Sequence, residues 1–443
     1  MVKGVSCRTV GCRLADAGVL TRIECELVVS RRLGTRDFEF LDVKLAKLGG
    51  DGLGFMSEQY AVDVRIRTAD SKLCNLRFFA KTLPRQSRLR EDFIAAYGCF
   101  NREVAFYSTV APLLKTALQQ NGGKQKYIPE CYFTTKDTLV FEDLTEGDFR
   151  SLEPGQALDY DHCSLVLKNL AALHAASILH EESVIKSEGK IYRISDSCSV
   201  DLVDKTTATV EIDGKARNWF DSCVKTVEPL LELLPKYKGR CEEIRAKLPR
   251  MRAVAERLLS PSDELRNVVC HGDLWTSNLL FRYQADSPTQ VRFVDFQMAR
   301  YLPPSTDVMV FLHLSTRRSF RQQWEPRLLG EYYEALEREL WHGGVDAQRV
   351  LPRQQFLDSC EAARDLGRAV AAAYCPTVLM PAEHTDGMLR MRDDFERILL
   401  VDRGREVCEC FLEYPDYRDR VTEVVQEFVD HCILSSNPSI QND

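Results

Sequence analysis

The sequence lacks the features that place a protein in a membrane or outside the cell. No run of apolar residues approaches the roughly 18 that a bilayer-crossing helix needs, and the first eight residues lack the apolar core of a signal peptide. An excess of positive charge is also missing, because the net charge is −7 at pH 7 with histidine neutral. We therefore expect a cytoplasmic protein whose partners include neither nucleic acid nor a membrane.

Paired cysteine motifs are missing too, although the chain has 16 cysteines. No Cys-x-x-Cys occurs, and the close pairs Cys7/Cys12 and Cys408/Cys410 lack a second cluster that would complete a zinc site. Scattered cysteines in a long chain without an export signal indicate free, mostly buried thiols in a reducing compartment.

What is present divides the 443 residues into three parts. Residues 1–37 predict a helical N-terminal extension. Residues 38–144 predict a small lobe with an antiparallel sheet and one main helix, and residues 145–443 predict a larger, mostly helical lobe. The expected fold class is therefore α+β with two lobes.

Hydrophobic patterning places the elements of both lobes. The small lobe is expected to contain three strands, one long helix and two more strands, at 38–43, 60–66, 74–81, 93–107, 132–135 and 138–141 respectively. Short strands at 268–269, 279–281 and 291–294 are expected to interrupt the helices of the larger lobe.

A glycine-rich turn at 49–54, with Gly50, Gly52 and Gly54, joins the first two strands and is followed by Ser57. Glycines in such a turn let backbone amides approach a phosphate closely. The alternative is a tight hairpin that binds nothing. The spacing is not a clean G-x-G-x-x-G and no helix follows, so neither a Rossmann fingerprint nor a Walker A loop is indicated.

Lys81 ends the third strand, and Glu103 follows it by 22 residues. A lysine in this place can bind α- and β-phosphates, and a glutamate can hold the lysine. Glu103 lies at the edge of the apolar stripe of the long helix, where a carboxylate is expected to be paired. The alternative is a solvated lysine and a solvated glutamate.

The segment from His271 to Asn278 reads His-Gly-Asp-Leu-Trp-Thr-Ser-Asn and follows a short apolar strand. Asp273 could accept a proton from an attacking hydroxyl group, and the side-chain oxygen of Asn278 could bind Mg²⁺. His271 is expected to brace the loop. The alternative is an ordinary polar turn.

A further strand ends in Asp295, which lies 22 residues after Asp273. That spacing allows a hairpin to bring both carboxylates to one cleft, where Asp295 could bind a metal. The alternative is an aspartate that only caps the end of a strand.

These motifs together resemble the aminoglycoside phosphotransferase and choline kinase superfamily, which has H-G-D-x-x-x-x-N where protein kinases have H-R-D. They resemble still more closely the ecdysteroid kinase-like (CHK kinase-like) family. The similarity runs from about 38 to about 320 and is carried by six segments, at 52–57, 79–84, 101–107, 170–177, 271–278 and 294–297.

The resemblance implies a protein-kinase-like fold and transfer of the γ-phosphoryl group of ATP, with Mg²⁺, to a hydroxyl of a small molecule, such as a steroid or a xenobiotic alcohol. By this resemblance Asp273 would be the catalytic base. Asn278 and Asp295 would bind Mg²⁺, and Lys81, paired with Glu103, would hold the phosphates beneath the glycine-rich turn.

The resemblance implies supporting roles as well. Glu142 to Leu144 would form a hinge that meets adenine through backbone groups. His174 would support the catalytic loop, and Asp307 would brace the helix that follows it. Trp275 is expected near the acceptor. Six aromatic residues of the larger lobe could line the acceptor pocket or simply belong to the core: Trp219, Phe220, Trp324, Tyr332, Tyr333 and Tyr374.

Two other functions remain as alternatives. A protein kinase is disfavoured because Gly272 replaces the arginine of H-R-D, because only 11 residues separate Asp295 from Asp307, and because no A-P-E follows. A non-catalytic nucleotide-binding protein or scaffold is disfavoured because Lys81, Asp273 and Asp295 are all present.

Overall fold

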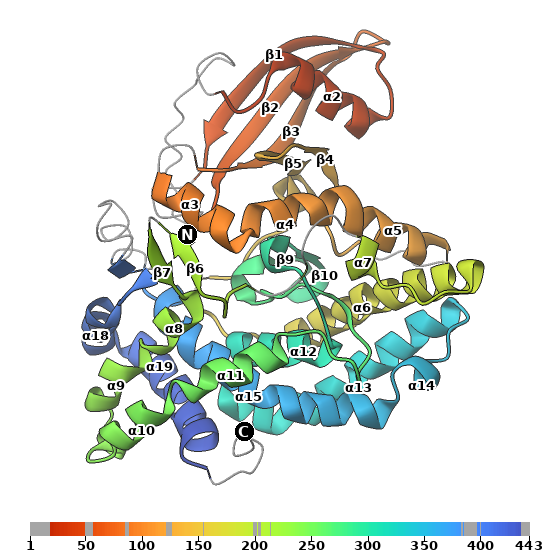
Figure 1. Cartoon of the computed structure of the whole chain (residues 1–443). Coiled ribbons are helices and arrows are strands. Elements are labelled where there is room, and N and C mark those ends of the chain that lie inside the picture. The colour runs from red at the N-terminus through yellow and green to blue at the C-terminus, as the bar shows by residue number, and fades with distance from the viewer. Residues whose placement is uncertain are drawn as a thin grey trace.

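The computed structural model has a small β-rich lobe above a larger helical lobe (Figure 1). It describes residues 18–48, 56–84, 88–120, 126–153, 155–197, 202, 205–212, 214–381, 384, 397–398 and 400–435. The predicted α+β, two-lobed architecture is confirmed.

The small lobe is built on a five-stranded antiparallel sheet in the order β1-β2-β3-β5-β4. The strands are β1 (Phe38–Lys47), β2 (Glu58–Thr68), β3 (Leu73–Thr82), β4 (Cys131–Thr134) and β5 (Thr138–Glu142). Buried and exposed residues alternate along most of β2, as a strand with one face on a core requires. All five strands predicted for this lobe are present.

Helix α2 (Arg22–Leu33) covers the sheet on the side away from the larger lobe (Figure 1). Thr21 and Glu24 form a reciprocal capping box at its start, which satisfies the first free amides. Its buried residues Cys25, Val28 and Val29 join the hydrophobic cluster on that face of the sheet. The predicted N-terminal helix is confirmed for 22–33, and residues 1–17 lie outside the described part.

The prediction of a single long helix over 93–107 is wrong. Helix α3 (Arg88–Tyr97) ends at Gly98, whose φ of +67° is left-handed, and α4 (Cys99–Ala105) begins after it. Glycine adopts this conformation without a steric cost and so ends a helix readily. A π-helical turn (Phe106–Val110) and α5 (Ala111–Gln120) continue the run, which lies between the sheet and the larger lobe (Figure 1).

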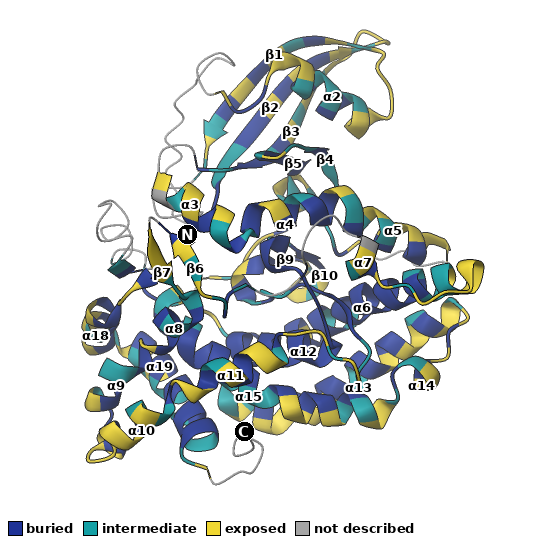
Figure 2. Cartoon of the chain, viewed as in Figure 1, coloured by how far each residue is buried: buried dark blue, intermediate teal, exposed yellow. Residues whose placement is uncertain are grey.

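The larger lobe is organised around α6 (Tyr160–Glu188) and α12 (Pro304–Ser315), whose residues are mostly buried (Figure 2). Helix α6 is long and apolar enough to cross a membrane, but 89% of its apolar window is buried inside the fold, as in a core helix. The other helices are α7 (Ile194–Ser197), α8 (Trp219–Val224), α9 (Val227–Leu233), α10 (Cys241–Lys247), α11 (Arg250–Leu258), α13 (Arg318–His342), α14 (Ala347–Val350), α15 (Arg353–Val378), α18 (Gly404–Glu413) and α19 (Pro415–Phe428).

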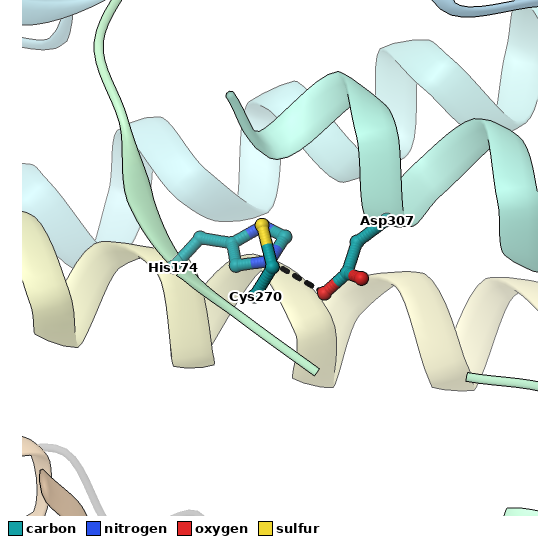
Figure 3. A group of neighbouring side chains, drawn as sticks. All are labelled: His174, Cys270 and Asp307. Atoms are coloured by element: carbon teal, nitrogen blue, oxygen red, sulfur yellow. Dashed lines mark hydrogen bonds and ion pairs between the residues drawn. The ribbon is translucent and has the colours of Figure 1, made fainter. Parts of the chain in front are cut away.

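Among the described residues, three short antiparallel pairs of strands interrupt these helices. They pair β8 (Val268–Cys270) with β11 (Arg300–Leu302), β9 (Leu279–Gln284) with β10 (Ser287–Phe293), and β6 (Val210–Ile212) with β7 (Lys215–Arg217). Strands β8, β9 and β10 were predicted, whereas β6, β7 and β11 were not. At the end of β8, Cys270 lies beside His174 of α6 and Asp307 of α12 (Figure 3).

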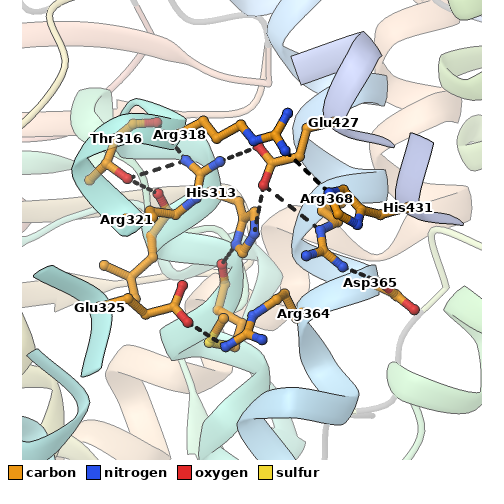
Figure 4. Close-up of polar contacts among 12 residues, drawn as sticks. His313, Thr316, Arg318, Arg321, Glu325, Arg364, Asp365, Arg368, Glu427 and His431 are labelled. Atoms are coloured by element: carbon orange, nitrogen blue, oxygen red, sulfur yellow. Dashed lines mark hydrogen bonds and ion pairs between the residues drawn. The ribbon is translucent and has the colours of Figure 1, made fainter. Parts of the chain in front are cut away.

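A buried network of charged residues ties α12, α13, α15 and α19 together (Figure 4). The guanidinium of Arg321 donates to Glu427, and also to the backbone oxygen of Thr316 at 2.8 Å. Glu427 in turn faces Arg368 at 3.8 Å and His313 at 3.9 Å. Burial and the neighbouring arginines lower the pKa of His313 well below its ordinary value, so the imidazole is neutral and Glu427 is the anion that balances the arginines.

Replacing Glu427 with alanine should therefore destabilise the larger lobe by roughly 3–5 kcal/mol, because Arg321 would stay buried without a counter-charge. The matched control is Glu409→Ala, which breaks the exposed pair with Arg405 and should leave stability almost unchanged. Chemical denaturation of both variants checks the prediction. Equal losses would show that the network contributes no more than a surface pair.

Candidate functional site

The loop after β8 is held by one buried carboxylate. Asp307 accepts hydrogen bonds from the backbone N–H of His271 at 2.5 Å and of Gly272 at 2.9 Å. His174 of α6 faces the same carboxylate at 3.3 Å and shares a hydrogen bond of 2.6 Å with the hydroxyl of Tyr332. Burial alone would raise the pKa of Asp307, but these donors outweigh it and hold the pKa below its ordinary value.

Asp307 was expected only to brace the helix that follows the loop, whereas the structure shows that its carboxylate also binds two backbone amides of the loop after β8. The supporting position predicted for His174 is present. Ligand atoms of His174, Cys270 and Asp307 lie within 4.8 Å of one another, which could suggest a metal site (Figure 3). All three residues are buried, and both Asp307 oxygens already bond to the loop amides, so the group serves the loop.

His271 braces the loop from within. Its Nδ1 accepts from the backbone N–H of Asp273 at 3.3 Å, so the proton lies on Nε2, which donates to the oxygen of Val294 at 3.0 Å. Burial lowers the pKa of His271 and keeps this neutral form. The ring also lies 4.4 Å from that of Phe296. The histidine thereby connects the loop to the segment around Asp295.

Gly272 is required by the backbone around it. Its φ is +79°, and a Cβ atom added there would lie 1.9 Å from the carbonyl oxygen of Met298. No side chain fits this position unless the segment at 296–298 moves.

Asp273 and Asn278 are brought together. The side-chain amide of Asn278 donates to the backbone oxygen of Asp273 at 2.7 Å and to its carboxylate at 3.1 Å. The side-chain oxygen of Asn278 is then left for another partner. Burial, and then the neighbouring carboxylate of Asp295, raise the pKa of Asp273 to about 7.

The predicted pair of Lys81 and Glu103 is present. The ammonium of Lys81 lies 2.6 Å from Glu103 and 2.7 Å from Asp295, so it bridges both carboxylates. Burial opposes a charge on Lys81, but Asp295 and Glu103 outweigh it and raise the pKa of the ammonium. Burial likewise raises the pKa of Glu103 against the attraction of Lys81.

Asp295 has a strained backbone. Its φ of +68° and ψ of +60° are left-handed, a conformation that costs a non-glycine residue about 1–2 kcal/mol. The conformation turns the chain from β10 into the 3₁₀ turn Phe296–Met298. The Asp295 side chain stays about one third exposed, at 30%, beside the buried Lys81.

Sequence reasoning missed the contacts that hold this turn against α4. The guanidinium of Arg102, itself buried, donates to the backbone oxygen of Gln297 at 3.1 Å. The rings of Phe106 and Phe296 stack with centroids 3.9 Å apart and planes 8° apart. A signal existed for Arg102, since a cation next to an apolar stripe needs a partner.

The remaining predicted nucleotide residues have varied positions. Gly50, Gly52 and Gly54 lie outside the described residues. Ser57 is buried just before β2. These positions neither support nor oppose a phosphate-binding turn.

The predicted hinge begins at the end of β5. The backbone N–H of Glu142 donates to the oxygen of Glu130 at 2.9 Å, and the Glu142 carboxylate accepts from the N–H of Glu130 at 3.0 Å. Leu144 starts a 3₁₀ turn over Leu144–Gly147.

A narrow cavity of about 30 Å³ opens beside Asp273. Trp219, Phe220 and Tyr374 line it, and the rings of Trp219 and Tyr374 stack 6.0 Å apart. Arg300, which sequence reasoning also missed, lines the same cavity. Three of the six aromatic residues that could line an acceptor pocket or belong to the core therefore line a cavity with Asp273.

The other aromatic candidates lie elsewhere. Trp324 packs on Tyr160, while Tyr332 and Tyr333 pack on Phe356 in the core. Trp275 is half-buried against the main core and is not among the residues that line the cavity beside Asp273. The expected contact of Trp275 with the acceptor stays a prediction.

Gly272→Ala should destabilise the protein by roughly 3 kcal/mol or more, because the new methyl group adds a backbone clash to the conformational cost. Gly239→Ala is the matched control, since Gly239 has a φ of +82° with nothing within 4 Å of the added Cβ. It should cost only about 1 kcal/mol. Urea denaturation measures both, and a similar cost at the two sites would contradict the clash.

Without added metal, Asp273→Asn should gain stability over the wild type as pH rises. Unfolding returns the Asp273 carboxyl to a pKa near 4, so between about pH 4 and 7 the folded state binds more protons and loses stability with rising pH. The asparagine variant does not titrate, so it should not lose the free energy of unfolding, on the order of 2 kcal/mol, that the wild type loses between pH 5 and pH 8. Melting curves in EDTA at pH 5 and pH 8 test it, with exposed Asp286→Asn as control. A pH-independent difference would contradict it.

Among solved structures, similar chains include a choline/ethanolamine kinase family protein from Mesorhizobium loti, with 14% identity, a TM-score of 0.32, and coverage of 86% of this chain and 92% of that chain. Another is the GDP complex of wild-type aminoglycoside 2'-phosphotransferase-IIIa, with 12% identity, a TM-score of 0.34, and coverage of 90% and 99%. No curated protein sequence matches the chain.

The family match covers a smaller share of the chain than these structural similarities, but it identifies the family. It spans residues 51–344, which is 294 of the 443 residues, and includes Lys81, Glu103, Asp273 and Asp295. The resemblance first indicated by the motifs is confirmed, and the chain belongs to the ecdysteroid kinase-like family.

Proposed function

We propose that this protein transfers the γ-phosphoryl group of ATP to a hydroxyl group of a small molecule, in a reaction that requires Mg²⁺. The observation that carries the proposal is the bridge from Lys81 to both Glu103 and Asp295, with the Asp273 loop clamped beside it. This is the set of charges that phosphoryl transfer needs, since the reaction depends on positioning and charge neutralisation more than on covalent catalysis.

Lys81 would bind the phosphates of the nucleotide. Its position is fixed by Glu103, which is buried behind it, while Asp295 lies on the more exposed side. Phosphate oxygens arriving from that side can take over the contact that Asp295 makes with the ammonium. Asp295 is then released to bind another cation.

Asp295 and Asn278 would hold Mg²⁺. Their donor set fits a hard cation, because it consists of a carboxylate and the side-chain oxygen that Asn278 leaves unused when its amide donates to Asp273. When bound, the metal ion neutralises charge on the phosphate oxygens.

Asp273 would act as the general base. A pKa of about 7 suits this role, because the carboxylate is available near neutral pH and still binds a proton readily. One hydrogen bond from the Asn278 amide orients the carboxylate and a second holds the backbone oxygen of Asp273. Asp307 and His271 hold the backbone of the loop beneath it. Asp273 can therefore take the proton of an acceptor hydroxyl placed in the cavity beside it.

The acceptor is proposed to be a steroid or a xenobiotic alcohol. The family description refers to ecdysteroids, and the cavity beside Asp273 has the aromatic walls Trp219 and Tyr374. A volume of about 30 Å³ admits a hydroxyl group and not a ring system, so the body of the acceptor would lie outside this cavity.

Two features of the site disfavour a protein kinase. Gly272 has no room for a Cβ atom, so the arginine of H-R-D does not fit there. The chain also turns directly from Phe296–Met298 into β11 and α12, which leaves no long activation segment.

Asp273→Asn should lower the rate of ATP-dependent acceptor phosphorylation by roughly 10²- to 10⁴-fold, because the general base is lost. The measurement is ADP formation in the presence of Mg²⁺ with a panel of steroid, alkaloid and phenolic alcohols, and the exposed variant Asp286→Asn is the control. Normal turnover by Asp273→Asn would show that another group is the base.

Asp295→Asn should abolish the extra stabilisation that Mg²⁺ adds to nucleotide binding. For the wild type, ligand at 100 times its Kd raises stability by about 2.7 kcal/mol, which a thermal-shift assay detects. The assay compares ATP alone with ATP and Mg²⁺ in both proteins. An unchanged Mg²⁺ effect in Asp295→Asn would mean that the metal binds elsewhere.

A further inference from the structure

A second and much larger cavity lies in the small lobe, between α5 and the segment that leads into β4. Its volume is about 430 Å³, which is within the range of ligand-binding pockets, and it shares no lining residue with the cavity beside Asp273. Ala111 and Leu118 of α5 form one side, and Tyr127 and Ile128 form the other. We call it the rear cavity.

One wall of the rear cavity presents a hydrogen-bond donor. Tyr107 lines the cavity and is only 6% exposed, yet its hydroxyl has no hydrogen-bond partner among the described residues. Burial raises the pKa of Tyr107 well above its ordinary value, so the hydroxyl keeps its proton and is a donor. The hydroxyl oxygen is open to the cavity, so a ligand with an acceptor atom can accept its hydrogen bond in place of solvent.

The mouth of the rear cavity is positively charged. Lys115 of α5 pairs with Glu130 at 2.6 Å, which cancels both charges. Lys126 is exposed at the same rim and, within the described part of the chain, has no ion-pair partner. The net charge at the rim therefore favours an anionic group on the occupant.

The Tyr107 wall directly continues helix α4, which contains Glu103, the partner of Lys81. Tyr107 follows Glu103 by four residues. The centroid of its ring lies 4.7 Å from that of Phe141 and 5.9 Å from that of Phe296. It lies in the π-helical turn Phe106–Val110, a type of turn that is frequent at functional sites. A movement of Tyr107 therefore acts on Glu103 from one side and on the turn after Asp295 from the other.

The opposite wall is tied to Asp295. The backbone oxygen of Tyr127 accepts from the N–H of Phe293 at 2.7 Å, two residues before Asp295. The guanidinium of Arg292 donates to the backbone oxygen of Lys126. The two walls are thus linked to the two segments that contain Glu103 and Asp295, the carboxylates that Lys81 bridges.

We propose that the rear cavity binds a small organic anion with an aromatic or alicyclic body, and that its occupant tightens nucleotide binding at the Lys81 site. The occupant accepts a hydrogen bond from Tyr107 and fills the space between the two walls. It thereby fixes the two segments that contain Glu103 and Asp295, so that Lys81 and the Asp295 carboxylate are already in position when a nucleotide takes over the contact between them. The coupling is reciprocal, so bound nucleotide raises the affinity of the rear cavity for its occupant by the same factor. The effect on nucleotide rests on the proposed function, whereas binding in the cavity does not.

The first test uses anilinonaphthalene sulfonate, which has fused rings and one anionic acceptor group, as a fluorescent probe of the full chain. Ala111→Phe fills the cavity and should abolish the binding phase that the wild type shows. Thr116→Phe, an exposed position on the same helix, should retain it. Tyr107→Phe removes only the hydroxyl and should weaken the probe roughly three- to tenfold. Identical titrations of Ala111→Phe and Thr116→Phe would overturn the site.

The second test measures coupling with a non-hydrolysable ATP analogue and Mg²⁺. Saturating probe should raise the affinity of the wild type for the analogue roughly fivefold or more, and should have no such effect in Ala111→Phe. An unchanged affinity in the wild type would overturn the coupling. If the probe binds in the cavity but the analogue does not bind with or without it, the proposed function fails and the rear cavity stands as a ligand site.

Discussion

The ammonium of Lys81 is the interaction on which the rest of the site depends. It lies on β3, and it joins Glu103 of α4 to Asp295 at the end of β10, so it connects the sheet, the helix beside the sheet and the larger lobe. A buried cation between two carboxylates is stable only as a complete set, because the loss of one partner leaves an uncompensated charge. The Phe106–Phe296 stack and the Arg102 bond to Gln297 hold the same three segments together, and they keep Asp295 in its strained conformation.

The larger lobe provides a second fixed point of a different kind. Asp307 clamps the loop through two backbone amides, with His174 and Tyr332 behind it in a fully buried chain of hydrogen bonds. No group in that chain has to move for a ligand to bind. The Lys81 bridge, in contrast, has its more exposed partner, Asp295, on the side from which a nucleotide would arrive. In the proposed reaction, the base would stay fixed by Asp307, while the contact between Lys81 and Asp295 would be exchanged for contacts with the phosphates.

Much of this could be predicted from the sequence because it depends on local patterns. Alternation marks β2, apolar runs mark β8 and β10, and the motif spacing pairs Lys81 with Glu103 and Asp273 with Asn278. Other features depend on contacts between distant segments. The need for Gly272 comes from the oxygen of Met298, and the clamp by Asp307 depends on the approach of α12 to the loop.

The predicted long helix failed for a local reason, since Gly98 breaks it while the apolar stripe continues in phase across the break. The same stripe concealed Tyr107, which looks like a core residue in the sequence and lines the rear cavity in the structure. The acceptor aromatics could not be sorted from the sequence either. Trp219 and Tyr374 line the cavity beside Asp273. Tyr332 is likewise an aromatic residue of the larger lobe, but it bonds to His174 in the core.

The central claim is that these charges transfer a phosphoryl group to a hydroxyl of a small molecule. Phosphorus-31 NMR of the purified chain with Mg²⁺, ATP and a pooled set of steroid and phenolic alcohols tests it most directly, because it identifies where the phosphorus goes. We predict that a phosphomonoester resonance appears in step with ADP. Intact ATP, or release of inorganic phosphate alone, would contradict the account.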